Sequence, residues 1–260
     1  MAPEPRHLLE INDLGIQFGG LTALEHVTFS LDPGEIVGLI GPNGAGKTTV
    51  FNLITGIYAP TTGSVYLGGT KLNGRRTFRI FQSGVARTFQ NIRLFKKLTV
   101  LDNVRIAAHN QMKYNPLTGA LRLPEYWREE ADITAKSMSM LDTFGLAEHA
   151  DTIASSLPYG QQRRLEIARA LISGPKLLLL DEPAAGMNPT ETQALMTTIR
   201  QVRNRFGVAI LLIEHDMRLV MGICERLVVL DYGQVIAKGT PAEIRANERV
   251  VKAYLGGSAV

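Results

Sequence analysis

The chain has 260 residues, of which 45% are hydrophobic and 20% are charged, and its formal net charge is +4. This composition is typical of a globular protein with a sizeable core, and the length allows one large domain or two small ones. The single cysteine, Cys224, excludes an internal disulfide and a thiolate metal cluster, and its apolar neighbours predict a buried structural thiol. No apolar run reaches the roughly 18 residues of a membrane-spanning helix, and we expect no secretory signal. No basic run is interleaved with aromatic residues, which argues against a nucleic-acid partner.

The first third of the chain is expected to be rich in strands. Apolar residues alternate with polar ones before a turn at residues 32–34, which predicts paired strands. A continuous apolar run at residues 36–40 predicts a buried strand, and apolar residues at helical spacing follow it. The elements expected here are strands over residues 11–18, 27–31, 36–40, 63–67 and 85–89, and a helix over residues 47–55.

A glycine-rich loop connects the strand at residues 36–40 to the following helix. Its glycines let successive backbone N–H groups face inward and bind anionic oxygens, and the helix N-terminus adds to this attraction. Lys47 adds a mobile charge for the β- and γ-phosphates, and the Thr48 hydroxyl can bind Mg²⁺. A glycine-rich turn that ends in Lys-Thr by chance is the alternative, which the strand and helix on either side disfavour. The residues expected to bind a nucleoside triphosphate here are Gly41, Pro42, Asn43, Gly44, Ala45, Gly46, Lys47, Thr48 and Thr49.

Residues 99–156 have a different pattern. Thr99 looks like the capping residue of a helix, and a polar stretch with Asn115, Pro116 and Gly119 follows. Helical spacing then continues over residues 126–144. We therefore expect a helical subdomain inserted into an α/β core, with Trp127 as a packing anchor.

The α/β pattern resumes after residue 160. A helical stripe is followed by strands and helices in alternation, then by a hairpin with its turn at residues 231–233 and a capping box at residues 240–243. The elements expected here are strands over residues 177–180, 208–213, 226–230 and 234–238, and a helix over residues 195–206. The sequence therefore predicts an α/β fold: a phosphate-loop NTPase core with an N-terminal antiparallel β subdomain and an inserted helical subdomain.

The strand at residues 177–180 ends in two carboxylates, Asp181 and Glu182. Ligands meet the carboxyl ends of parallel strands, where these side chains emerge. Asp181 is expected to hold Mg²⁺, directly or through water, and Glu182 to act as general base for an attacking water. An acidic turn is the alternative for such a pair alone, but the phosphate loop upstream favours the catalytic roles.

With these motifs in this order, the chain resembles the ATP-binding subunits of ABC transporters over nearly its whole length. Phe18 resembles the aromatic residue that stacks on adenine; a core phenylalanine is the alternative. Gln90 resembles the glutamine that senses Mg²⁺ and the γ-phosphate, and His215 resembles the histidine that contacts the γ-phosphate. The segment Leu-Pro-Tyr-Gly-Gln-Gln-Arg at residues 157–163 resembles the signature motif, so Gly160 and Gln161 would serve a second subunit. With Lys47 and Glu182, the resemblance makes Gln90 and His215 the catalytic candidates.

Two stretches depart from the pattern of this family. Pro158 and Tyr159 stand where the signature usually has serine and glycine, so the amides from Gly160 onward are expected to bind the γ-phosphate. Asn188 stands where an aspartate is usual, which removes a charge. The signature sequence, the long insert and the segment at residues 239–244 resemble the branched-chain amino acid importers, and the longer of their two ATPases in particular.

The resemblance implies an ATPase that uses ATP and Mg²⁺ to drive import. It implies a peripheral protein on the cytoplasmic face of the bacterial inner membrane, with membrane permease subunits and a second, identical or sister cassette as partners. A solute-binding protein would be an indirect partner, and nucleic acid is not expected. The chain would be one ABC ATPase domain, residues 1–260, with a RecA-like core at 1–98 and 157–260 and a helical subdomain at about 99–156.

Other functions stay open from the sequence. The chain can be an ABC ATPase for another solute, such as urea, an amide or a lipid. It can be a soluble ABC-type ATPase that acts on ribosomes or DNA, or a nucleotide-binding regulator without catalysis. The resemblance implies that other chains of the transporter determine which solute is carried.

Overall fold

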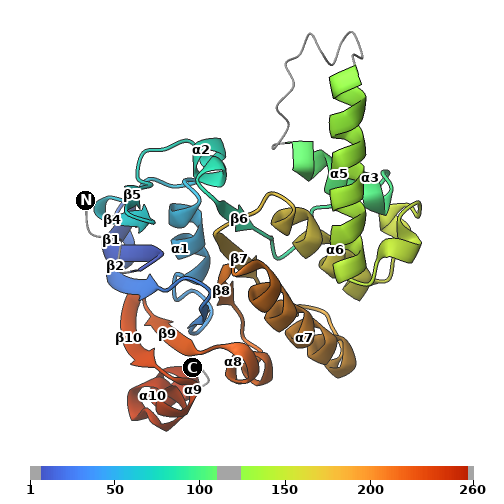
Figure 1. The fold of residues 1–260 in the computed structure, drawn as a ribbon. Coiled ribbons are helices and arrows are strands. Elements are labelled where there is room, and N and C mark those ends of the chain that lie inside the picture. Colours follow the sequence, from blue (N-terminus) through green and yellow to red (C-terminus); the bar gives the residue numbers. More distant parts are fainter. Residues whose placement is uncertain (1–6, 110–123, 257–260) are drawn as a thin grey trace. The chain divides into compact units, whose positions relative to one another are not determined.

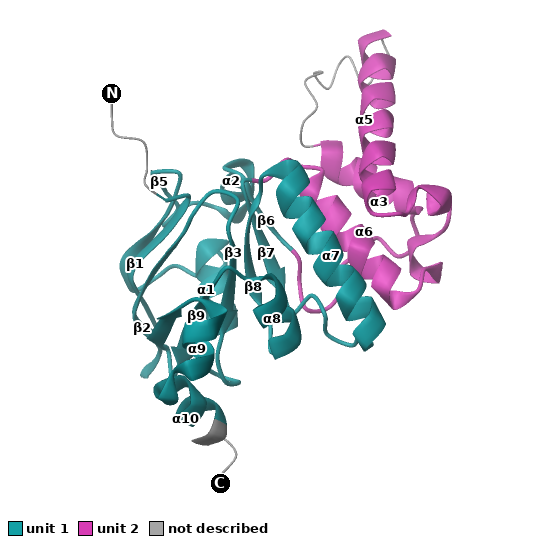
Figure 2. Cartoon of the chain, turned by 60° about the horizontal axis from the view of Figure 1, so that its bottom comes forward, with its two compact units in different colours: residues 1–87, 176–260 teal, residues 88–175 magenta. Residues whose placement is uncertain are grey.

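The computed structural model describes residues 7–109 and 124–256. This part of the chain divides into two compact units, drawn in different colours in Figure 2. Unit 1 comprises residues 1–87 and 176–260, and unit 2 comprises residues 88–175. Unit 2 spans more than the helical insert expected at about 99–156, because it also includes residues 88–98 and 157–175.

Unit 1 begins with a four-stranded antiparallel sheet, as the alternating apolar residues predict. Its strand order is β2-β1-β4-β5, and β1 pairs with β2 on one side and β4 on the other. The paired register puts Leu9 opposite both Leu31 and Leu67, and all three side chains are buried. The strands of this sheet are β1 (Leu9–Phe18), β2 (Leu21–Leu31), β4 (Thr62–Leu67) and β5 (Thr70–Lys71).

The second sheet of unit 1 has six strands in the order β10-β9-β3-β8-β7-β6. Figure 1 labels β10, β9, β8, β7 and β6, and Figure 2 labels β3. The neighbours from β9 to β6 are parallel, and β10 forms the predicted hairpin with β9. Strands β3, β7 and β8 are buried along their whole length, as expected for a parallel sheet whose faces are covered. The strands are β3 (Ile36–Ile40), β6 (Val85–Arg87), β7 (Leu177–Asp181), β8 (Ala209–Ile213), β9 (Arg226–Asp231) and β10 (Gln234–Gly239).

The order of these strands places the site. Strand β8 lies between β3 and β7, and all three run parallel. Their carboxyl ends therefore meet at one edge of the sheet. The phosphate loop leaves β3 there, Asp181 ends β7, and His215 follows β8.

One apolar core cluster joins the two sheets of unit 1. It includes Phe51 and Ile54 of the helix that follows the phosphate loop, together with residues of both sheets. Burial of this apolar area is the main stabilising contribution to the unit. The helices of unit 1 are α1 (Lys47–Ile54), α2 (Thr77–Gln82), α7 (Pro189–Phe206), α8 (Met217–Ile223), α9 (Pro241–Ala246) and α10 (Glu248–Gly256).

Unit 2 is helical. Its α3 begins where the sequence predicts, since the Thr99 hydroxyl accepts a hydrogen bond from the Asp102 N–H. Helices α3, α5 and α6 pack on one another through buried residues such as Val104, Leu141 and Leu165. The elements are α3 (Val100–Ala108), α5 (Pro124–Thr143), η2 (Ala147–His149), η3 (Ala154–Ser156) and α6 (Tyr159–Leu171).

Trp127 is not a packing anchor: its residue is 56% exposed, and its ring makes an edge contact with Tyr126 on the same helix. The strand expected over residues 85–89 ends at Arg87. Cys224 is buried as predicted, and burial raises the pKa of its thiol. Among the described residues no helix is both long and apolar enough to cross a membrane.

The expectations for the start of the chain and for the polar stretch with Asn115, Pro116 and Gly119 concern residues outside those that the structure describes.

Candidate nucleotide site

The phosphate loop has the backbone conformation that its glycines predict. Gly41, Gly44 and Gly46 have φ angles of 150°, 79° and 100°, which residues other than glycine rarely adopt. A Cβ atom on Gly41 would overlap the backbone carbonyl oxygen of Leu230, whereas one on Gly44 would meet nothing. Gly41 is therefore required for space as well as for conformation.

Lys47 lies folded back on this loop. Its Nζ donates hydrogen bonds to the carbonyl oxygens of Gly41 at 2.7 Å and Pro42 at 2.8 Å. Burial lowers the pKa of the Lys47 ammonium, and the negative charge of Glu182 opposes that shift. A cation held against the loop by neutral carbonyls is placed to bind an anion that enters the cradle.

Glu182 and His215 come together at the edge of the parallel sheet. His215 Nδ1 lies 3.8 Å from Glu182 Oε1, and the Glu182 N–H donates to the Ile213 carbonyl at 2.9 Å. Glu182 has a φ of 46°, a strained value for a residue with a side chain. The fold thus holds this carboxylate beside the histidine in a conformation that costs free energy.

Asp181, the other predicted acid, is buried and paired. Its Oδ2 lies 2.6 Å from a guanidinium nitrogen of Arg87, and both side chains are almost fully buried. The second terminal nitrogen of Arg87 donates to Asn52 Oδ1 on helix α1 at 2.8 Å. One guanidinium therefore connects the carboxylate at the end of β7 to the helix that follows the phosphate loop.

Glu214 is a buried residue to which the sequence analysis assigned no role. Its Oε1 accepts the Ala184 N–H at 2.7 Å, and its Oε2 accepts the N–H groups of His215 at 3.1 Å and Asp216 at 3.4 Å. Burial raises the pKa of Glu214, and these hydrogen bonds oppose the shift. Glu214 therefore fixes the backbone on both sides of the Glu182–His215 pair.

Phe18 is 42% exposed, which argues against a core role and leaves its ring available to a base. Its partner is Tyr58, which the sequence did not suggest: the two ring centroids are 5.1 Å apart at an interplanar angle of 73°. Such an edge-to-face contact fixes the orientation of an aromatic ring.

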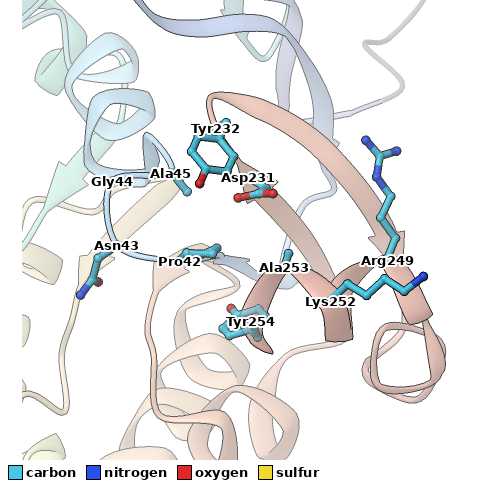
Figure 3. A pocket seen from close by; sticks show the side chains of 10 residues that line it. All are labelled: Pro42, Asn43, Gly44, Ala45, Asp231, Tyr232, Arg249, Lys252, Ala253 and Tyr254. Carbon is cyan, nitrogen blue, oxygen red and sulfur yellow. The ribbon is translucent and has the colours of Figure 1, made fainter. Parts of the chain in front are cut away.

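Residues 42–45 of the phosphate loop line a cavity of about 940 Å³ together with helix α10 (Figure 3). Tyr254 of α10 lies in this wall, where burial raises the pKa of its phenol and a hydrogen bond from the Gly41 N–H opposes the rise. Because α10 and the loop are far apart in sequence, local motifs gave no sign of this contact. The lining residues are Pro42, Asn43, Gly44, Ala45, Asp231, Tyr232, Arg249, Lys252, Ala253 and Tyr254.

Gln90, Gly160 and Gln161 belong to unit 2. Helix α6 begins at Tyr159 with Pro158 as its N-cap, and the Gln161 N–H donates to the Pro158 carbonyl at 3.0 Å. The backbone N–H of Gln161 thus makes its hydrogen bond within the first turn of the helix. Asn188, the other departure, caps α7 in unit 1 through a reciprocal capping box with Glu191.

The oxygen atoms at the site suit Mg²⁺. Within residues 7–109 and 124–256, no three His, Cys, Asp or Glu side chains form a metal-binding group. Magnesium in nucleotide sites needs no such group, because it takes one or two protein oxygens and completes its shell with phosphates and water. The Thr48 hydroxyl at the exposed start of α1 and the Asp181 carboxylate are hard donors of this kind.

Comparisons with known proteins point to one family. A family model described as ABC transporter matches residues 24–185, and one described as branched-chain amino acid ATP-binding cassette transporter matches residues 234–260. The chain is 49% identical over 249 residues to the high-affinity branched-chain amino acid transport ATP-binding protein LivG of Escherichia coli (strain K12), covering 96% of this chain and 98% of that protein. It is 46% identical over 251 residues to BraF of Pseudomonas aeruginosa, which carries the same description, with coverage of 96% and 98%.

A solved structure supports the same assignment. The ADP conformation of MJ1267, an ATP-binding cassette of an ABC transporter, matches with a TM-score of 0.84 at 29% identity. The match covers 97% of this chain and 100% of that structure.

Proposed function

The chain belongs to the ABC transporter family, and on that premise we propose that it is the ATP-hydrolysing subunit of an importer for branched-chain amino acids. The observation that carries the chemistry is the position of the Glu182 carboxylate. Its Oε1 lies 3.8 Å from His215 Nδ1. Its negative charge also opposes the lowering of the Lys47 pKa that burial causes. A carboxylate, a histidine and a lysine beside a phosphate loop are the groups that phosphoryl transfer to water needs.

We assign each residue a role that its position supports. The loop amides from Gly41 to Thr49 and the Lys47 ammonium bind the triphosphate. Glu182 accepts a hydrogen bond from the attacking water and orients it, and His215 binds the γ-phosphate from the other side. Phe18 stacks on the adenine.

Thr48, Asp181 and Gln90 are the residues that would hold Mg²⁺. When bound, the ion neutralises charge on the phosphate oxygens. Arg87 keeps the Asp181 side chain in one place for that purpose, since its guanidinium holds one carboxylate oxygen at 2.6 Å.

The assembly is part of the same proposal. The residues 1–260 act as one ABC ATPase domain, whose helical subdomain carries the signature. Gly160 and Gln161 bind the nucleotide of a second cassette, so ATP bridges two subunits and its hydrolysis lets them separate. The chain lies on the cytoplasmic face of the membrane, bound to permease subunits, with a solute-binding protein as an indirect partner.

Exposed apolar residues on unit 2 support a docking role. Phe95 is exposed although it follows Gln90 by only five residues, and the guanidinium of Arg169 lies 5.6 Å from its ring centroid. A large exposed ring close to a functional loop is typical of an interface. We assign this surface to the permease subunits.

The catalytic assignment is tested with Glu182→Gln in the purified chain. The amide keeps the size of the side chain but cannot accept a proton, so ATP binding is expected to remain while turnover falls about 10²-fold or more. Glu191→Gln, which alters an exposed cap on α7, is the control and should turn over like the parent. Normal turnover in Glu182→Gln would remove this residue from the mechanism.

The transported solute is tested in the assembled transporter. Leucine, isoleucine or valine with its binding protein should stimulate ATP hydrolysis, while urea and short amides should not. Stimulation by another solute alone would leave the ATPase assignment standing and replace the substrate.

A further inference from the structure

We propose that the buried pair Arg163–Glu166 is a positioning device that couples the loop carrying Gln90 to the start of helix α6. The proposal rests on the function proposed above, because Gln90 serves the nucleotide of its own subunit and Gly160 that of the partner cassette. All the groups involved belong to unit 2. The pair therefore connects, within one compact unit, the elements that serve the two nucleotide sites.

Arg163 holds the loop on the N-terminal side of this connection. Its side chain is fully buried, with 0% exposure. One terminal nitrogen donates to the Phe89 carbonyl at 2.7 Å, and the other donates to the Gln90 carbonyl at 2.7 Å. A planar guanidinium that binds two consecutive carbonyls fixes both their separation and their orientation.

Glu166 holds the same loop from its other end. Its Oε2 accepts the Arg163 guanidinium at 2.7 Å, and its Oε1 accepts the Arg93 N–H at 3.0 Å. The two side chains lie three residues apart on α6 and together contact the loop backbone at residues 89, 90 and 93. These contacts lie on both sides of Gln90 and tie its backbone to α6.

The same network reaches the first residue of α6. The Tyr159 hydroxyl lies 3.3 Å from Arg163, and the guanidinium lies 6.0 Å from the centre of the tyrosine ring. Tyr159 stands where the resembling signature motifs usually have glycine, which has no side chain to make such a contact. The departure in sequence therefore extends the network to the residue before Gly160.

Stability alone does not account for this arrangement. Removing two charges from water costs about as much free energy as their attraction returns, so an apolar pair of similar volume is often as stable as a buried ion pair. What an apolar pair cannot do is bind three backbone groups of a neighbouring loop. The geometry thus points to position rather than to net stability.

The test is a full-length double variant, Arg163→Met/Glu166→Leu, which removes both charges together. The control is Arg164→Met, since Arg164 is the next residue on α6 and donates to the Phe144 carbonyl at 2.9 Å, away from Gln90. The thermal midpoint of unfolding reports whether the variant folds. The affinity for a fluorescent ATP analogue reports whether the phosphate loop still binds nucleotide. Amide hydrogen exchange of residues 88–94 and the kcat and KM for ATP report the positioning of Gln90.

The double variant should stay folded but melt at a lower temperature, because the Phe89 and Gln90 carbonyls and the Arg93 N–H lose their partners. It should bind the analogue within about twofold of the parent. Its kcat should fall about tenfold at little change in KM, because a displaced catalytic loop costs rate rather than binding. Exchange at residues 88–94 should become faster, and the control should match the parent. Parental exchange together with parental kcat in the folded double variant would overturn the proposal.

A second variant decides if the double variant does not fold. Glu166→Gln keeps the volume and the acceptor for the Arg93 N–H but removes the charge that holds Arg163. Faster exchange at residues 88–94 with a lower kcat supports the proposal, and parental values of both overturn it. Failure of the parent to bind the ATP analogue would instead count against the proposed function.

Discussion

The phosphate loop of unit 1 and the loop carrying Gln90 in unit 2 depend to different degrees on backbone conformation. In the phosphate loop three glycines have positive φ angles, and a Cβ atom on Gly41 would overlap the Leu230 carbonyl, although the Lys47 ammonium also bonds the Gly41 and Pro42 carbonyls. The loop around Gln90 is held by side chains of α6, through hydrogen bonds from Arg163 and to Glu166. A loop that binds phosphate through its own amides needs its backbone exposed, whereas a loop that presents one side chain can have its backbone covered.

The two loops should also respond differently to substitution. A change in the phosphate loop strains the chain locally, because the forbidden conformation belongs to one residue. A change in the side-chain contacts around Gln90 leaves a buried charge or carbonyl without a partner, which costs more.

The largest effect is expected where unit 1 itself depends on a buried side-chain contact, at Arg87. Arg87→Gln leaves the buried Asp181 carboxylate without its counter-charge, so the free energy of unfolding should fall by about 3–5 kcal/mol, as for other broken buried pairs. Chemical unfolding monitored by fluorescence measures this loss. ATP affinity measured with and without Mg²⁺ should also lose its dependence on the ion.

The control for Arg87 is Arg79→Gln on α2, whose guanidinium bonds the exposed Gln82. It should change the free energy of unfolding by less than about 0.5 kcal/mol. Equal effects of the two substitutions would mean that burial and pairing do not distinguish them.

A smaller loss of stability is expected when a glycine of the phosphate loop is replaced. Gly41→Ala would drive a Cβ atom into the Leu230 carbonyl, so we expect a loss of about 3 kcal/mol and of ATP binding. Gly44→Ala has the same kind of φ penalty, but the space around the added Cβ atom is open. It should therefore lower the free energy of unfolding by only about 1 kcal/mol. Thermal unfolding and ATP titration of the two variants measure the difference, and equal losses would contradict the role of the Leu230 contact.

The smallest effect concerns pH and Glu214. Because burial raises the pKa of Glu214 above the ordinary value of 4.5, the fold favours the neutral carboxyl. Its contribution to stability is therefore fully present below pH 4.5 and is lost as the pH rises through the folded pKa. Unfolding curves across this range should fall less with pH in Glu214→Gln than in the parent. The same slope in both would show that another group causes the pH dependence.

The same difference explains what the sequence could and could not reveal. Glycine spacing and the carboxylates after an apolar strand are local patterns, so the sequence predicts Lys47, Asp181 and Glu182 as site residues from their neighbours alone. The order of the strands then brought His215 to Glu182, as parallel pairing requires.

The side-chain contacts were not predictable in this way. Arg163 bonds a carbonyl 74 residues away, and Arg87 bonds Asp181 at a separation of 94 residues. Nothing local distinguishes these arginines from exposed ones. The prediction for Trp127 was wrong for a related reason. Helical spacing identifies a helix but does not show whether one large residue lies on its buried face.

The central claim is that a triphosphate is bound by the loop amides and the Lys47 ammonium, and an ATP titration of Lys47→Ala tests it most directly. The affinity of Lys47→Ala for Mg-ATP should be lower by about 10²-fold, since a charge-assisted contact to the phosphates is lost, while Lys238→Ala on β10 should bind like the parent. Parental affinity in Lys47→Ala would contradict the account.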